Sequence, residues 1–200
     1  MEVNTKVYLS GLILDNPVIP ASGTFGFGKE YVDFYDINIL GSISIKGTTV
    51  QRRKGNPQPR IAECYSGLIN SVGLENPGMD NVIQKELKDL EKIYRKPVIA
   101  NISGFSVEEY VTLSREMDQV DNVGIIEVNI SCPNVDHGGL AFGTNANNVR
   151  ELTKKIKEVT TKPVYMKLSP NVTDIKEIAR AAEEGGADGI SLINTLMGMR

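Results

Sequence analysis

The sequence predicts an α/β protein whose strands form part of a (β/α)8 barrel, also called a TIM barrel. Short apolar runs of strand length alternate with longer amphipathic stretches along the chain, which is the order of a parallel sheet with crossover helices. The apolar runs are continuous and rich in β-branched residues, as in strands buried on both faces. Five of these runs end in lysine or asparagine. A barrel gathers such strand ends on one face, whereas an open sheet spreads them along a line.

Each element follows from this alternation. The expected strands cover residues 18–21, 42–46, 98–102, 125–130, 164–168 and 189–194. The expected helices cover residues 29–35, 81–94, 107–119, 145–160 and 174–184. Gly185 and Gly186 follow the last helix as a stop signal. About six of the eight strand–helix units of a TIM barrel are therefore expected in this chain.

The length of 200 residues predicts one domain over residues 1–200. Residues 47–78, between the second strand and its helix, form an excursion far longer than the usual loop of about 2–6 residues. Long loops of this kind usually carry function. We expect this excursion to cover the site.

Composition excludes several classes of protein. Lysine and arginine number 22 and aspartate and glutamate 25, so the formal net charge is −3; a chain that coats nucleic acid needs a concentrated basic surface instead. The start has no basic segment followed by a long apolar run, which predicts a soluble cytoplasmic protein without a membrane segment. Cys64 and Cys132 are the only cysteines, too few and too distant for a disulfide framework or a metal site.

The polar residues at the strand ends are the first candidates for a site. They are Lys46, Asn101, Asn129, Lys167 and Asn194. A lysine at the end of a buried strand is costly to desolvate unless an anion lies beside it, although each lysine could instead extend to the rim. Asparagines offer both a donor and an acceptor, so they suit a ring with alternating N–H and C=O groups. Their alternative role is to satisfy loop backbone.

Cys132 is the sharpest candidate for chemistry. It follows the strand in "VNISCPNVDHGG", and a thiol can act as nucleophile or general base. A lone cysteine is more often a small buried apolar residue. His137, the only histidine, lies five positions further on, and we expect a solvated loop residue rather than a partner of the thiol.

Two further segments carry weaker signals. The stretch "SGTFGFG" is glycine-rich but lacks the P-loop lysine and the dinucleotide-binding spacing. The stretch "QRRKGNPQPR" is expected to be a solvated basic surface, with steering of an anionic substrate as the alternative.

Several segments together resemble the class 1 dihydroorotate dehydrogenases. They are "ASGTFGFGKEY", "SIKGTT", "GNPQPR", "INSVGLENPG", "ANISG", "VNISCPNVDHGG", "VYMKLSPN" and "SLINT", in this order. The first two look more like the NAD-linked class 1B catalytic subunit than the fumarate-using class 1A enzyme. The resemblance implies a TIM-barrel flavoprotein that binds FMN and oxidises (S)-dihydroorotate to orotate in pyrimidine biosynthesis.

The resemblance also implies roles for individual residues. Cys132 would be the base that takes the proton beside the ring carbonyl, while a hydride passes to N5 of FMN. Substrate would contact Lys46, Asn70, Ser71, Val72, Gly73, Leu74, Asn129, Asn194 and Thr195. FMN would contact Ser22, Lys46, Gly47, Asn101, Asn129, Lys167 and Ile193. No residue is assigned to a metal, and Cys64 receives no role.

Class 1B resemblance further implies a homodimer, joined into a heterotetramer by an electron-transfer subunit with FAD and a [2Fe–2S] cluster that passes electrons to NAD. Family members continue through two more strand–helix units that supply the FMN phosphate site, so the chain is expected to be C-terminally incomplete.

Three alternatives stay open: a fumarate-dependent class 1A enzyme, a dihydrouridine synthase, which should carry a basic RNA-binding surface, and a non-catalytic fragment.

Overall fold

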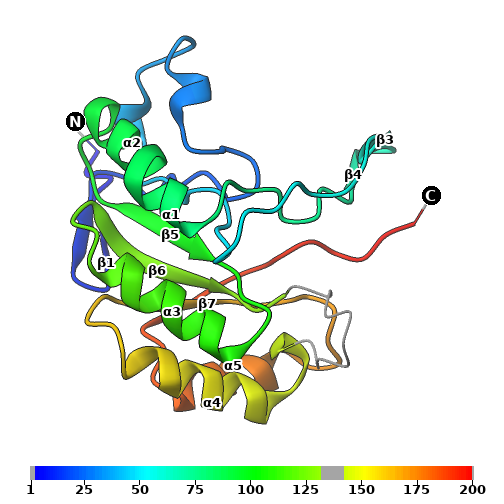
Figure 1. Cartoon of the computed structure of the whole chain (residues 1–200). Coiled ribbons are helices and arrows are strands. Elements are labelled where there is room, and N and C mark those ends of the chain that lie inside the picture. Colours follow the sequence, from blue (N-terminus) through cyan, green and yellow to red (C-terminus); the bar gives the residue numbers. More distant parts are fainter. Residues whose placement is uncertain (1–2, 132–141, 200) are drawn as a thin grey trace.

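A computed structural model describes residues 3–131 and 142–199, and a parallel four-stranded sheet lies at its centre (Figure 1). The strands are β5 (Val98–Ile102), β6 (Val123–Asn129), β7 (Val164–Lys167) and β8 (Gly189–Ser191). They are hydrogen-bonded in the order β5-β6-β7-β8, and each strand pairs with the next one along the chain. A doubly wound sheet would reverse its order at a switch point. This simple succession is the winding of a barrel.

Two further segments continue the sheet beyond β5, although neither is a regular strand. Residues 42–46 lie beside β5, where Ile45 N–H donates to the Ile99 carbonyl at 3.0 Å. Residues 18–21 lie beside them, because Gly41 N–H donates to the Val18 carbonyl at 3.0 Å. The prediction of regular strands there is wrong, and Pro20 gives one reason, since proline has no N–H for the ladder. The α/β TIM-barrel class is confirmed, with six strand positions in chain order.

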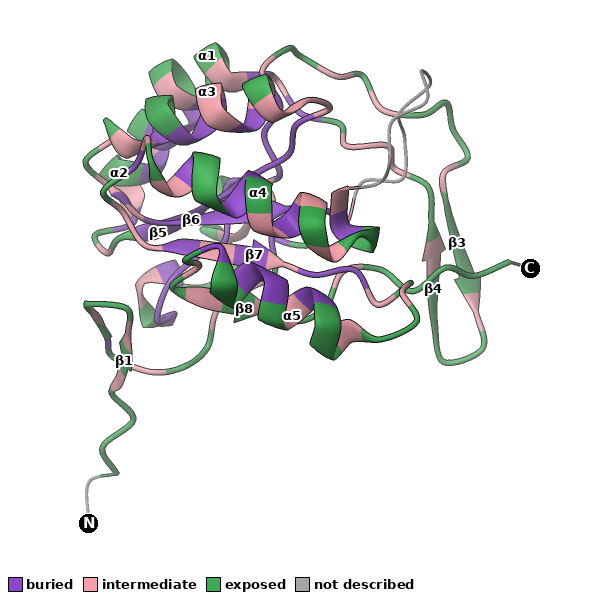
Figure 2. Ribbon diagram, turned by 90° about the horizontal axis from the view of Figure 1, so that it is seen from below, coloured by how far each residue is buried: buried purple, intermediate pink, exposed green. Residues whose placement is uncertain are grey.

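Three predicted helices form close to their expected bounds. They are α3 (Val107–Asp118), α4 (Ala146–Lys157) and α5 (Ile175–Glu184), and η4 (Phe142–Thr144) precedes α4. At each α-helix start a polar side chain accepts a backbone N–H of the first turn, namely that of Ser106, Asn145 or Asp174. Their buried sides face the sheet (Figure 2). Within the described residues, no helix combines the length and apolar character needed to cross a membrane.

Two other predicted helices are altered. The stretch expected at 29–35 holds only a 3-10 turn, η1 (Lys29–Tyr31), and a second such turn, η2 (Ile37–Ile39), follows. The stretch expected at 81–94 begins at Met79 and has three parts: α1 (Met79–Asn81), the π-helical η3 (Val82–Glu86) and α2 (Leu87–Ile93). The amphipathic pattern predicts helix but cannot distinguish a π-helical insertion.

Two β-hairpins were not predicted. One pairs β1 (Val7–Leu9) with β2 (Leu12–Leu14), and the other pairs β3 (Ile61–Cys64) with β4 (Gly67–Asn70) inside the long excursion. Figures 1 and 2 place them at opposite ends of the sheet, with the β3–β4 hairpin on the side of the C-terminal segment. The excursion therefore extends from the end of the sheet that carries the carboxyl ends of the parallel strands.

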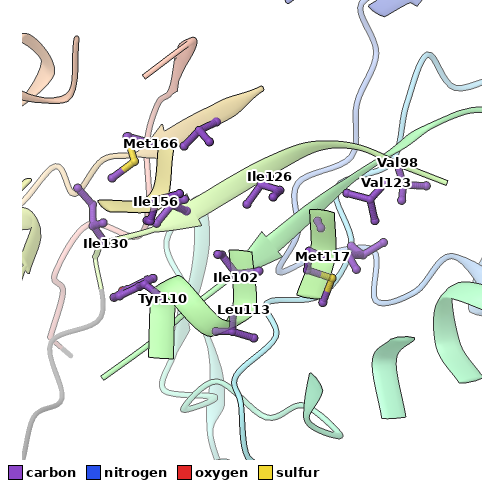
Figure 3. Packing of buried hydrophobic residues seen from close by; sticks show 14 of the residues in the cluster. Val98, Ile102, Tyr110, Leu113, Met117, Val123, Ile126, Ile130, Ile156 and Met166 are labelled. Carbon is purple, nitrogen blue, oxygen red and sulfur yellow. The ribbon is translucent and has the colours of Figure 1, made fainter. Parts of the chain in front are cut away.

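The apolar core lies between the sheet and the helices (Figure 3). Ile102 and Ile126 of the sheet and Leu113 and Met117 of α3 are each fully enclosed. Tyr110 of α3 is also 1% exposed, and its hydroxyl donates to the Asn129 carbonyl at 2.7 Å. The core thus extends to the end of β6 and holds the backbone from which Asn129 projects.

Asp118 at the end of α3 fastens the loop that leads into β7. Its Oδ1 accepts hydrogen bonds from Thr160 Oγ1 at 2.6 Å, Thr161 N at 2.8 Å and Lys162 N at 3.1 Å. Burial raises the pKa of Asp118, but these hydrogen bonds outweigh burial and hold that pKa below its usual value.

Replacing Asp118 with alanine should lower the free energy of unfolding at pH 7 by about 1 to 3 kcal/mol, measured by urea denaturation. Because the folded-state pKa is depressed, this contribution is present above the unfolded-state pKa and is lost as pH falls through the folded-state pKa. The difference in the free energy of unfolding between the Asp118→Ala protein and the parent should therefore become smaller at acid pH. Asp121→Ala removes an exposed carboxylate nearby and should change stability by less than about 0.5 kcal/mol. Equal losses in both variants would contradict the role of Asp118.

Candidate active site

A buried carboxylate, Glu127 in β6, organises a polar cluster inside the curved sheet. It is 7% exposed, and its Oε2 accepts from Asn101 Nδ2 at 2.6 Å and from Ser44 Oγ at 3.1 Å. Lys167 Nζ of β7 lies 3.8 Å from the same oxygen. A buried charge is tolerated only when it is paired and hydrogen-bonded. Four neighbouring strand positions are therefore linked by one carboxylate.

Lys167 also reaches the first strand position. Its Nζ donates to Ser22 Oγ at 3.3 Å, across 145 residues of sequence. Three strand positions, namely residues 42–46, β5 and β6, lie between Ser22 and Lys167. The two side chains can meet only if the sheet curves around an interior. The lysine thus has a partner on two sides, and its side chain is only 13% exposed.

Glycine at position 47 permits the strand end to approach Asn101. A Cβ on Gly47 would lie 2.9 Å from Asn101 Oδ1, which is closer than real Cβ contacts allow. Asn101 is 1% exposed, and its Oδ1 accepts no hydrogen bond from a described residue. This oxygen is an available acceptor beside a backbone that carries no side chain.

A cavity of about 510 Å³ lies where β6 ends, between the excursion and the C-terminal segment. Its volume is in the range of small-molecule sites. The lining residues come from β4 and the turn after it, from the end of β6, from the loop after β7 and from residues 194–198. Its walls combine amides and hydroxyls with aliphatic side chains. Such a mixture suits a small polar ring rather than a long apolar ligand.

Asparagines at two strand ends meet in this cavity. Asn194 Nδ2 donates to Asn129 Oδ1 at 2.9 Å, and the same oxygen accepts from Ser131 N at 3.1 Å. Asn129 Nδ2 makes no hydrogen bond to a described residue, so it can donate to a ligand. Asn129 is also the register partner of Lys167. The cavity and the Glu127 cluster are therefore adjacent on the same two strands.

The excursion forms the opposite wall and is fixed by its own hydrogen bonds. Asn76 Oδ1 accepts from Gly78 N at 2.9 Å and from Thr49 N at 3.2 Å, which ties the two ends of the excursion together. Gly73 and Leu74 have positive φ angles of 77° and 54°. These left-handed conformations turn the chain back from β4 toward the sheet.

The structure brings together most of the predicted site residues. Those predicted for substrate line the cavity, except Lys46: they are Asn70, Ser71, Val72, Gly73, Leu74, Asn129, Asn194 and Thr195. Those predicted for FMN that lie at or beside the Glu127 cluster are Ser22, Gly47, Asn101 and Lys167. Lys46 and Ile193 do not line the cavity, and within the described residues no hydrogen bond or ion pair joins them to the Glu127 cluster. The Lys46 backbone N–H donates to the Gly26 carbonyl, and Ile193 is 46% exposed. Cys132 and His137 lie outside the described residues.

Two residues of the site were missed in the sequence. Glu127 interrupts the apolar run "IIEVN", and a charge inside a buried strand is itself a signal, since such charges need partners. Arg53 was grouped with a solvated basic surface. Arg52 and Lys54 are indeed exposed, but Arg53 is partly buried and lines the cavity. Among the described residues, no three potential metal ligands cluster.

Comparisons with known proteins agree with one another. The family model described as dihydroorotate dehydrogenase matches residues 4–200. The catalytic subunit of dihydroorotate dehydrogenase B (NAD(+)) from Bacillus cytotoxicus is 56% identical over 195 residues, covering 98% of this chain and 63% of that protein. The subunit of the same name from Enterococcus faecalis is 57% identical over 194 residues, covering 97% of this chain and 62% of the relative.

A third such subunit, from Halalkalibacterium halodurans, is 56% identical over 194 residues, with 97% of this chain covered. The chain spans 63% of the length of that relative. The family model matches nearly every residue, and identities of this size show common ancestry. The chain belongs to the dihydroorotate dehydrogenase family.

Proposed function

We propose that this chain forms the FMN-binding part of an oxidoreductase that converts (S)-dihydroorotate to orotate in pyrimidine biosynthesis. The observation that carries the proposal is the cavity of about 510 Å³, lined by Asn70, Asn129 and Asn194 and adjoining the Glu127 cluster. Asparagine amides complement the N–H and C=O groups of a pyrimidine ring. The names of the relatives support the same reaction.

The residues of the Glu127 cluster fit the flavin ring of FMN. Asn101 Oδ1 offers an acceptor, Lys167 offers a cation, and Gly47 lets a planar group approach the backbone. We propose that FMN is held by Ser22, Lys46, Gly47, Asn101, Asn129, Lys167 and Ile193. When bound, FMN supplies the two-electron acceptor that no amino-acid side chain provides.

Oxidation of dihydroorotate removes two hydrogens from adjacent ring carbons. One leaves as a proton from the carbon beside the ring carbonyl, and the other leaves with an electron pair as hydride. We propose Cys132 as the base that accepts the proton. The asparagines would hold the ring by its amide edges. The turn after β4, at residues 71–74, would close over the ring and exclude water.

The name of the relatives also indicates the final acceptor, NAD. We propose that electrons leave through a partner subunit with FAD and a [2Fe–2S] cluster, and that two copies of each subunit form a heterotetramer around a homodimer of this chain. A cytoplasmic location, without nucleic acid as a partner, belongs to the same proposal.

The proposed function can be tested by loading the purified protein with FMN and adding dihydroorotate without oxygen. We expect loss of the yellow flavin absorbance and formation of orotate in equal amounts. A protein that takes up FMN but is not bleached would refute the proposed substrate. A colourless protein that takes up no FMN would favour a non-catalytic role.

The electron acceptor needs a separate measurement. Reoxidation of the reduced protein by fumarate alone would favour the class 1A alternative. Reoxidation by NAD only after the FAD-containing partner is added would support the class 1B assignment.

A further inference from the structure

The two lysines predicted at strand ends differ in their charged neighbours. Among the described residues no carboxylate is paired with Lys46. Lys167, the last residue of β7, has its Nζ 3.8 Å from Oε2 of Glu127. The two side chains of this pair are 13% and 9% exposed. Of the two lysines, only Lys167 therefore has its charge offset by a described carboxylate.

Hydrogen bonds hold the Glu127 carboxylate in this position. Its Oε2 accepts from Asn101 Nδ2 at 2.6 Å and from Ser44 Oγ at 3.1 Å, and both donors come from neighbouring strand positions. A charge in a medium of low polarity acts more strongly over the same distance than it does in water. Glu127 is thus a fixed negative charge directly beside Asn101 and Lys167, two of the residues that fit the flavin ring.

A charge beside a flavin changes how tightly the ring holds electrons. A hydride brings two electrons and one proton, so a ring that accepts a hydride gains one negative charge. A nearby cation stabilises the reduced ring and raises its reduction potential, and a nearby anion lowers that potential. Lys167 and Glu127 therefore act in opposite directions on a flavin bound at the cluster.

We propose that Glu127 offsets the charge of Lys167 and thereby lowers the reduction potential of the bound flavin. This inference rests on the proposed function, and it gives Glu127 a role in setting the potential through its neighbour. Without the carboxylate, Lys167 would stabilise the reduced ring and retain the electrons. A lower potential makes the reduced flavin a better electron donor, which suits an enzyme that must pass electrons onward after each oxidation of substrate.

Glu127→Gln tests the charge separately from the hydrogen bonds. Glutamine keeps an oxygen that can accept from Asn101 Nδ2 and Ser44 Oγ, but it carries no charge. The FMN-loaded protein is reduced without oxygen beside a reference dye, and the spectra of dye and flavin give the potential. The ratio of the affinities for reduced and oxidised FMN should rise about tenfold above that of the parent. For a two-electron couple, this change raises the potential by about 30 mV.

Two further variants separate charge from structure. Lys167→Gln should lower the potential, and the double variant Glu127→Gln/Lys167→Gln should lie between the two single variants. Ser44→Ala is the matched control, because it removes one hydrogen bond from the carboxylate and keeps the charge. Its affinity ratio should stay within about threefold of the parent, which is about 15 mV in potential.

An unchanged or lower potential in Glu127→Gln would overturn the proposal. A Glu127→Gln protein that folds but takes up no FMN would overturn it as well, since the carboxylate would then be needed to hold the cofactor. If Glu127→Gln does not fold, the double variant is compared with Lys167→Gln, and equal potentials in these two would overturn the proposal.

These potentials are measured without dihydroorotate, which keeps the test separate from that of the proposed substrate. A parent protein that takes up FMN but is not bleached by dihydroorotate would refute the proposed substrate alone. A parent protein that takes up no FMN would refute both the proposed function and the role of Glu127.

Discussion

Replacing Cys132 with alanine should slow reduction of the flavin by dihydroorotate about 10²- to 10⁴-fold at neutral pH, the usual contribution of a general base. FMN and orotate should still bind, because the cavity and the Glu127 cluster are built from other residues. Rapid mixing without oxygen measures the reduction rate, and equilibrium titration measures binding. The combination of intact binding with lost rate separates a base from a structural residue.

Cys64 supplies the control for this experiment. It lies in β3, is partly exposed and does not line the cavity. In the Cys64→Ala protein, dihydroorotate should reduce the flavin at the same rate as in the parent. A Cys132→Ala protein that is reduced within about threefold of the parent rate would remove Cys132 from the role of base.

Replacing Glu127 with alanine should lower the free energy of unfolding by about 3 to 5 kcal/mol, which is the cost of removing one partner of a buried pair. The change would leave Lys167 without its carboxylate, and it would leave Asn101 Nδ2 and Ser44 Oγ without an acceptor. FMN affinity should fall at least tenfold, because the cluster would no longer hold these groups in place. Urea denaturation without FMN and fluorescence titration with FMN measure the two effects independently.

An exposed pair on α4 gives the comparison. Glu151 and Lys154 are 2.9 Å apart but largely in solvent. Glu151→Ala should change stability by less than about 1 kcal/mol and should leave FMN affinity unchanged. A Glu127→Ala protein as stable as Glu151→Ala would show that the buried carboxylate is not required by the fold.

The parallel part of the fold was predictable from the sequence because its central strands, β5 and β6, are buried along nearly their whole length. The mainly apolar runs of β5, β6 and β7 predict strands, and the amphipathic repeats of α3, α4 and α5 predict helices. Residues 18–21 and 42–46 were predicted as strands, but they are joined to the sheet only by single bridges and scattered backbone hydrogen bonds. Their pairing depends on neighbours distant in sequence, which an apolar run does not encode.

The hairpins escaped prediction for a different reason. The turn of the β1–β2 hairpin uses Ser10 and Gly11, both with positive φ, and a Ser-Gly pair was an available signal. The turn of the β3–β4 hairpin contains Ser66 at φ 64°, where glycine or asparagine is usual. Its residues are mostly exposed, so no apolar alternation marks its strands.

Strand-end residues were predictable as a group because parallel strands place their carboxyl ends at one edge. The contacts of Asn129 with Asn194, and of Asn101 with Glu127, agree with that expectation. The position of Arg53 was not predictable, because residue type alone does not distinguish it from Arg52 beside it. Only the backbone pairing with Asn76 turns one arginine inward and leaves the other in solvent.

The contact between Glu127 and Asn101 also decides which hydrogen-bonding group Asn101 presents at the end of β5. An ionised carboxylate only accepts hydrogen bonds, so Asn101 must turn Nδ2 toward Glu127 and Oδ1 toward Gly47. The strand end then offers an acceptor at that point, which favours a heterocycle with an N–H there and disfavours the same ring methylated on that nitrogen. Recognition of one edge of a ligand is thus dictated by a side chain on the adjacent strand.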